Sequence, residues 1–349
     1  MSKRIVFCFD GTWQLPMNNT NVYRLFKALT QTAEQVCFYD DGAGADAKGF
    51  QRILQGAFGL DLPQIILDGY TKIAHVYEPG DTIYLFGFSR GAYTARSLAG
   101  MIGSCGLPTG KFTDDCVSKV WDAYRNPATR AAALAALGPC GLGQATIQMI
   151  GVWDTVGALG IPAIKGGVDA ARFGFLNTDL NPKVKFAYQC LAIDEHRQQF
   201  PATLWTGGAA PGQTLEQVWF SGCHGDVGGG TVVGTADNGT RLCDVTFAYM
   251  LKKAQGAGLD FDPTAIAPFA SLPAEDALDI IRDSWTPANL KPYLRPIAKD
   301  SIISNSVALR LQYALTYTPA NLILDDGPPT ALDDGYTVMD LVGGPMPTE

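Results

Sequence analysis

A single serine stands between two glycines in the stretch Gly87-Phe88-Ser89-Arg90-Gly91. The apolar run Thr82–Phe86 precedes it and an alanine-rich segment follows, which predicts a sharp turn from a strand into a helix. Such a turn exposes the serine Oγ and points the first backbone amides of the helix at a developing oxyanion. We therefore predict that Ser89 is a nucleophile. The two glycines would let the strand and the helix approach closely.

A serine nucleophile needs a base, because its hydroxyl is barely ionised at neutral pH. The chain has three histidines. His75 lies inside a helical pattern upstream of the serine and is predicted to be structural. His196 follows one strand-like run, whereas His224 follows the last clear run of the series, Glu216–Phe220. In the chain order serine, acid, histidine, the base comes last, so His224 is favoured over His196.

The acid that would orient the histidine has two candidates. Asp154 ends the strand-like run QMIGVWD, and Asp194 ends the next run, in CLAIDEH. Both would lie at the carboxyl edge of a parallel sheet, where active sites of α/β proteins form. Asp226 is too near His224 along the chain and is predicted to hold the glycine-rich turn instead. These patterns alone leave Asp154 and Asp194 open.

The stretch FCFDGTW predicts a second turn at the same sheet edge. A backbone amide of Gly11 or Thr12, together with that of Arg90, could form an oxyanion hole. The alternative is an ordinary turn stabilised by the side chain of Asp10.

Short apolar runs alternate with helical patterns along the chain, which predicts a mainly parallel sheet with right-handed crossovers and helices on both faces. The predicted strands are Ile5–Phe9, Val36–Tyr39, Thr82–Phe86, Thr146–Val152, Val184–Ile193 and Glu216–Phe220.

One domain over residues 1–349 is the simplest organisation, since the sequence contains no repeat or linker. Residues 106–143 interrupt the alternation with two helices that break at Asn126-Pro127, and residues 157–182 are rich in glycine and proline. We expect both insertions to cover the serine as a helical and loop cap. From about residue 240 onward the pattern is mainly helical.

The bulk properties exclude some functions. The net charge of −8 argues against nucleic acid as a partner, because phosphate binding needs clustered basic residues. No apolar run approaches the roughly 20 residues of a membrane-spanning helix. The N-terminal stretch lacks the pattern of a signal peptide, which favours a cytoplasmic protein and leaves signal-independent export open. The eight cysteines include no CxxC pair, so we expect reduced thiols and no zinc site. We also expect no cofactor.

Five motifs in order, FDGTW, GFSRGA, GVWDTVGALG, LAIDEHRQQF and CHGDVGGG, give the chain a family resemblance. It resembles the bacterial and fungal α/β-hydrolases that are related to the catalytic domain of type VI secretion phospholipase effectors of the first lipase class. The resemblance implies an α/β-hydrolase fold with Ser89 as nucleophile, His224 as base and Asp154 as acid. The Asp154 loop and FDGT also resemble the acid loop and oxyanion segment of fungal triacylglycerol lipases, which favours Asp154 over Asp194.

These observations predict a serine hydrolase that cleaves carboxylic esters, including lipid esters, through an acyl-enzyme. The specific alternative is a phospholipase A acting on membrane lipid, with peripheral membrane contact. A catalytically degenerate hydrolase fold that serves as a binding module is the non-enzymatic alternative, and a nucleotide-binding α/β protein is a third. The sequence does not determine the oligomeric state.

Overall fold

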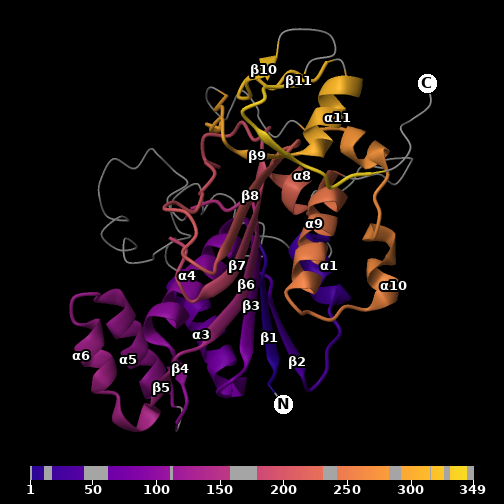
Figure 1. The fold of residues 1–349 in the computed structure, drawn as a ribbon. Coiled ribbons are helices and arrows are strands. Elements are labelled where there is room, and N and C mark those ends of the chain that lie inside the picture. The colour runs from indigo at the N-terminus through magenta and orange to yellow at the C-terminus, as the bar shows by residue number, and fades with distance from the viewer. Residues whose placement is uncertain are drawn as a thin grey trace.

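A parallel β-sheet of eight strands forms the centre of the molecule (Figure 1). The computed structural model describes residues 2–11, 18–42, 62–110, 113–157, 179–230, 242–282, 292–314, 316–325 and 331–343. The spatial strand order is β12-β9-β8-β7-β6-β3-β1-β2. The strands are β1 (Arg4–Phe9), β2 (Gln35–Asp40), β3 (Thr82–Phe88), β6 (Thr146–Trp153), β7 (Val184–Ala192), β8 (Thr214–Phe220), β9 (Ile302–Ser304) and β12 (Thr337–Met339). All six predicted strands are present, and the α/β-hydrolase-like fold class is confirmed.

Both faces of the sheet are buried, which explains why its central strands are apolar throughout rather than alternating. In β1, Ile5, Phe7 and Phe9 point into one hydrophobic core. The intervening Val6 and Cys8 point into a second core on the opposite face. Every one of these five side chains is at most 1% exposed.

Helices cover both faces of the sheet, as the alternating pattern predicted (Figure 1). The first core contains residues of α3 (Leu62–Val76), α4 (Ser89–Cys105) and α5 (Asp114–Arg125). The second contains residues of α1 (Asn21–Ala28) and α9 (Leu242–Gly256). A third, smaller core joins β8 and β9 to α11 (Asn305–Tyr313).

The insertion at residues 106–143 does not cap the serine, contrary to expectation. It forms α5 and α6 (Arg130–Ala135), broken at Asn126-Pro127 as predicted. A short antiparallel pair, β4 (Leu107–Pro108) with β5 (Leu142–Gly143), closes the insertion beyond the C-terminal end of α4. Ser89 begins α4, and a 17-residue helix is about 25 Å long, so this hairpin lies far from the serine. Of the second expected cap, residues 158–178 lie outside the described part of the chain.

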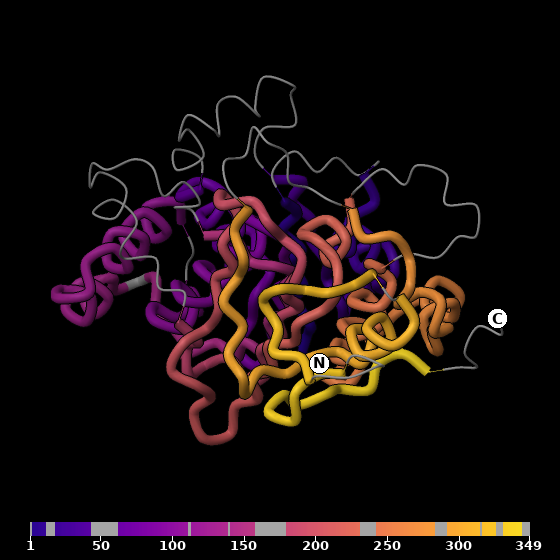
Figure 2. Tube along the Cα trace, turned by 90° about the horizontal axis from the view of Figure 1, so that it is seen from above, coloured from indigo at the N-terminus to yellow at the C-terminus, as the bar shows by residue number. Residues whose placement is uncertain are grey.

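The C-terminal region is less helical than predicted. The pattern from about residue 240 onward predicts mainly helical structure, but Ile302–Ser304 forms β9 and only then does α11 begin. The polar tail supplies the edge strand β12, parallel to β9. Figure 2 shows most of this orange-to-yellow region at the other end of the molecule from the magenta α5 and α6. The remaining short elements are α10 (Pro263–Ile266), β10 (Leu324–Asp325), β11 (Ala331–Leu332) and 3₁₀ turns at Gly138–Cys140, Ala267–Phe269 and Ala274–Leu278.

The expectation that all cysteines are reduced is wrong for one pair. Cys116 on α5 and Cys140 after α6 form a disulfide, with Cα atoms 6.1 Å apart. Spacing could not predict it, because the turn between α5 and α6 brings together residues 24 positions apart. The other six are free thiols. Within the described ranges, no helix is both long and apolar enough to cross a membrane.

Candidate active site

Ser89 lies at the junction of β3 and α4, without an intervening loop. Its φ of 58° is left-handed, a conformation that non-glycine residues rarely adopt. Such strain persists where the surrounding structure enforces it, and it is typical of functional positions. The serine is 7% exposed.

The two glycines that flank Ser89 are required by close backbone contacts. A Cβ on Gly87 would lie 2.4 Å from the carbonyl oxygen of Gly91. A Cβ on Gly91 would lie 2.3 Å from the carbonyl oxygen of Phe9 and 2.4 Å from that of Asp10. Each is far inside van der Waals contact, so any larger residue would push α4 away from β3 or β1. Together they fix the start of α4 at the carboxyl edge of the sheet.

Asp154 and His224 meet at the same edge. Asp154 directly follows β6, and His224 is the first residue of the short helix α8 (His224–Gly228) after β8. His224 Nδ1 lies 2.5 Å from Asp154 Oδ2. The backbone amide of Ala192, at the end of β7, donates to Asp154 Oδ1 at 3.0 Å. Like Ser89, Asp154 has a left-handed φ, of 39°.

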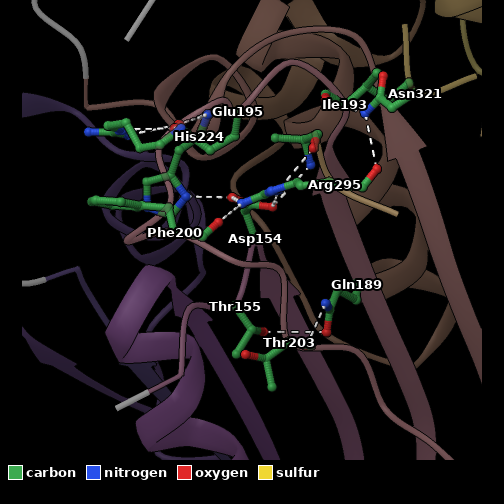
Figure 3. A network of polar contacts seen from close by, with 12 residues as sticks. Asp154, Thr155, Gln189, Ile193, Glu195, Phe200, Thr203, His224, Arg295 and Asn321 are labelled. Carbon is green, nitrogen blue, oxygen red and sulfur yellow. Dashed lines mark hydrogen bonds and ion pairs between the residues drawn. The ribbon is translucent and has the colours of Figure 1, made fainter. Parts of the chain in front are cut away.

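A buried arginine holds the other side of the carboxylate (Figure 3). Arg295 donates from Nη1 to Asp154 Oδ1 at 2.6 Å and from Nη2 to Oδ2 at 2.9 Å. Burial alone would raise the pKa of Asp154, but the charge of Arg295 and the hydrogen bond from His224 outweigh it and hold that pKa well below its usual range. Asp154 is therefore ionised at neutral pH.

Two aromatic rings enclose the imidazole of His224. The ring of Phe88, which precedes the serine, lies 4.5 Å from the imidazole between centroids. The ring of Phe200 packs edge-on at 5.0 Å. Burial lowers the pKa of His224 more than Asp154 raises it, so the resting imidazole is neutral. With Nδ1–H donated to Asp154, Nε2 is left as a free acceptor, which is the form that a general base requires.

Phe88 places Ser89 near the imidazole, because its ring packs against the His224 ring and it precedes Ser89 in the chain. In the part of the chain that the structure describes, no hydrogen bond joins Ser89 to His224. Hydrogen bonds of this kind are often long without substrate and tighten in its presence.

The structure describes two of the three predicted oxyanion donors, and they lie in different surroundings. The Gly11 amide donates to its own neighbour's carboxylate, Asp10 Oδ1, at 2.7 Å. This is the turn stabilised by Asp10 that was the alternative reading of FDGTW. Thr12 lies outside the described residues. Arg90 lies in the first turn of α4, whose leading amides have no partner within the helix.

The alternative acid, Asp194, lies away from the base. Its Oδ2 accepts the amide of Gly222 at 2.6 Å and the hydroxyl of Tyr317 at 3.1 Å. It thus fixes the loop before His224 rather than the imidazole. The alternative base His196 follows Asp194 and is half-buried, and His75 is exposed near the end of α3. Neither forms an ion pair with Asp154 in the described structure.

Sequence reasoning assigned no role to four residues around His224. Glu195 Oε2 accepts the backbone amide of His224 at 3.2 Å, and Arg197 binds Glu195 through two nitrogens at 2.8 Å each. The guanidinium of Arg197 lies 3.8 Å from the Phe200 ring centroid. These three belong to the LAIDEHRQQF motif, which was a usable signal. Arg295 lies in no recognised motif, so nothing in the sequence pointed to it.

Within the described ranges, no group of three or more histidine, cysteine or acidic side chains could hold a metal ion. The geometry therefore offers a serine, an ionised acid and a neutral imidazole at one sheet edge. The fold and this arrangement define an α/β-hydrolase-like protein.

Residues 3–253 match the family described as the type VI secretion phospholipase effector Tle1-like catalytic domain. The chain belongs to this family.

An uncharacterized protein of Saccharomyces cerevisiae is 37% identical over 139 residues, which cover 35% of this chain and 20% of that protein. A crystal structure of an uncharacterized protein from Pseudomonas aeruginosa is 18% identical, with a TM-score of 0.46, and covers 76% of this chain and 47% of the other. The Tle1 effector bound to the VgrG spike of the type 6 secretion system is 19% identical, with a TM-score of 0.38, over 66% and 51% of the two chains. The chain thus spans about half or less of the length of each relative.

Proposed function

We propose that this protein is a serine hydrolase that cleaves carboxylic esters, with Ser89 as nucleophile, His224 as general base and Asp154 as the orienting acid. The observation that carries the proposal is the 2.5 Å contact between His224 Nδ1 and Asp154 Oδ2, beside a serine with a left-handed backbone. The site also offers a neutral imidazole whose Nε2 is an acceptor.

In the first step, Ser89 Oγ attacks the acyl carbon of the ester while His224 Nε2 takes the hydroxyl proton. The imidazolium then protonates the departing alcohol, which leaves an acyl group on the serine. Water, deprotonated by the same imidazole, releases the acid and restores the serine. Asp154 keeps the imidazole in the required tautomer and stabilises its charged form.

The backbone amide of Arg90 is the donor that we assign to the oxyanion, because it lies at the N-terminus of α4 beside Ser89. Gly11 and Thr12 remain proposed second donors. The amide of Gly11 can take part only if it leaves Asp10 Oδ1 when substrate binds.

The substrate class that we propose is a lipid ester, and phospholipase A activity at a membrane surface is the second candidate. The family's phospholipase effectors favour this candidate. A net charge of −8 makes contact with zwitterionic lipid easier than with an anionic surface.

The test is hydrolysis of p-nitrophenyl esters from acetate to palmitate, with Ser89→Ala beside the wild type, followed by phosphatidylcholine vesicles. We expect Ser89→Ala to lower the rate by about 10⁴-fold or more and to abolish fluorophosphonate labelling. Cleavage of vesicle lipid that exceeds cleavage of the soluble esters would favour the phospholipase. A folded wild type that neither turns over any ester nor takes up the fluorophosphonate would favour the binding module and refute the proposal.

A cytoplasmic location remains a proposal. Six free thiols agree with a reducing compartment, whereas the Cys116–Cys140 disulfide is the kind of bond that persists in an oxidising one. Alkylation of the protein in its native cells, followed by mass spectrometry of these two cysteines, decides between them.

A further inference from the structure

Arg295 reaches the site from a distant part of the chain. It is 141 residues from Asp154 in sequence and lies beyond residues 3–253, the span that matches the family. Its side chain is fully buried. A buried charge is costly unless it is paired and hydrogen-bonded, so its position calls for an explanation.

Four hydrogen bonds fix the guanidinium (Figure 3). Besides the two bonds to Asp154, Nη1 donates to the carbonyl of Ala192 at 2.8 Å and Nη2 donates to the carbonyl of Phe200 at 2.7 Å. Asn321 Nδ2 donates to the carbonyl oxygens of Ile193, at 3.0 Å, and Arg295, at 3.3 Å. The guanidinium thus joins the ends of β6 and β7 and the segment that carries Phe200.

The same contacts link Arg295 to the imidazole by two routes. One runs through the carboxylate, because Asp154 Oδ2 accepts from both Arg295 and His224. The other runs through Phe200, whose carbonyl binds Arg295 and whose ring packs on His224. Arg295 therefore contacts both Asp154 and the residue whose ring packs on the imidazole of His224.

The charges around His224 balance in the resting state. Asp154 and Glu195 are ionised, since the pKa of each is held below its usual value by a neighbouring arginine against the effect of burial. Arg295 and Arg197 supply the two positive charges. Other titratable and charged groups near the pair, among the described residues, include Asp194, the thiols of Cys190 and Cys223, whose pKa values burial raises, and the Asp226–Arg282 ion pair of α8.

We propose that Arg295 is a positioning residue for hydrolysis: it orients Asp154 through both carboxylate oxygens and offsets its charge, which together with the burial of the ring keeps His224 unprotonated at neutral pH. The proposal rests on the proposed function of Asp154 and His224. A purely structural ion pair would support the fold but would not set the protonation of the imidazole.

The test compares Arg295→Met and Arg295→Lys with the wild type in the intact chain. Loss of the charge in Arg295→Met should lower kcat about 10- to 100-fold. It should also move the acid limb of the pH profile of kcat/KM to higher pH by about 1 unit or more, because Asp154 then stabilises the imidazolium without compensation. Arg295→Lys should keep the limb near its wild-type position but still lower kcat, since an ammonium cannot bind both oxygens side by side.

The matched control is Arg310→Met, which removes another buried arginine of the C-terminal region. Arg310 donates to the carbonyls of Ala277 and Asp279 and touches neither Asp154 nor His224. It should lose stability without a shift of the pH profile. An unshifted profile for folded Arg295→Met, or an equal shift for Arg310→Met, overturns the proposal.

A measurement on the wild type keeps the proposal testable if Arg295→Met does not fold. The chain has three histidines, so nitrogen-15 labelling of histidine gives few signals, and His224→Ala assigns the one of interest. We expect the His224 pKa to lie below the usual value of about 6.5, with Nδ1 protonated. A value above it overturns the proposal, because an uncompensated carboxylate would raise it. Fluorophosphonate labelling of Ser89 in the same sample tests the proposed function separately from this titration.

Discussion

Replacing Asp154 with asparagine, beside the same change at Asp194, separates the two candidate acids. Asp154 accepts four hydrogen bonds, from His224, from the amide of Ala192 and from two nitrogens of Arg295. Asparagine has one acceptor oxygen, and its NH₂ group must face a donor, either His224 Nδ1–H or Arg295. If the NH₂ group faces His224, the imidazole must adopt the other tautomer, which removes Nε2 as a base. If it faces Arg295, the guanidinium loses one of its two acceptors on this side chain.

The expected loss of activity is about 10⁴-fold, or about 5.5 kcal/mol of transition-state stabilisation, as for the corresponding change in the Ser-His-Asp triad of serine proteases. Stability should fall as well, by about 3 kcal/mol or more, because a buried arginine loses its charged partner. Asp194→Asn should behave differently, since its oxygen can still accept the amide of Gly222. Its activity should stay within about tenfold of the wild type, because the change does not reach the imidazole.

The assay is kcat/KM on the best p-nitrophenyl ester near neutral pH, with fluorophosphonate labelling and thermal unfolding in parallel. Near-ultraviolet circular dichroism establishes that both variants are folded. The reasoning fails if Asp194→Asn loses as much activity as Asp154→Asn, or if folded Asp154→Asn keeps more than about a tenth of the wild-type rate.

Three further predictions concern the scaffold. Burial raises the pKa of Asp10 from 3.8 to about 6 despite its hydrogen bonds, so the folded state holds that proton more tightly than the unfolded chain. The free energy of unfolding should therefore fall by up to about 3 kcal/mol as pH rises through this window, and Asp10→Asn should flatten the trend in urea titrations. Gly91→Ala should destabilise the protein and abolish fluorophosphonate labelling of Ser89, whereas Gly256→Ala, whose Cβ would meet nothing within 4 Å, should be neutral or slightly stabilising; equal melting temperatures for the two would contradict the packing argument. Replacing both Cys116 and Cys140 with alanine should lower the free energy of unfolding by roughly 3 kcal/mol and leave ester hydrolysis unchanged, and a large loss of hydrolysis would mean that α5 and α6 act on the site.

The sequence determined the elements that carry the candidate site. Gly87 and Gly91 predicted the strand-to-helix turn, and the structure has β3 ending at Phe88 and α4 beginning at Ser89. The six main strands followed from their apolar runs, because a strand buried on both faces must be apolar throughout. Since parallel strands end at one edge, Asp154 and His224 could be placed at that edge before any contact was known.

Tertiary structure alone decided which groups meet there. Asp154 and Asp194 both end buried strands, and only the packing of α8 turns His224 toward Asp154. The short strands β9 and β12 have three residues each, too few for a pattern. They form because β9 pairs with the edge of β8 and β12 then pairs with β9.

Arg295 is the clearest example of a site residue that the sequence pattern could not predict. The sequence patterns that predict strands and helices involve residues close together along the chain. There, backbone sterics and the spacing of apolar side chains restrict the backbone to a few conformations. An ion pair across 141 residues depends instead on where the chain returns after several elements have packed. The sequence by itself therefore established a strand–serine–helix turn in a parallel sheet. The contact between the buried guanidinium and Asp154 was decided by the tertiary structure alone, because only the folded chain brings these two segments together.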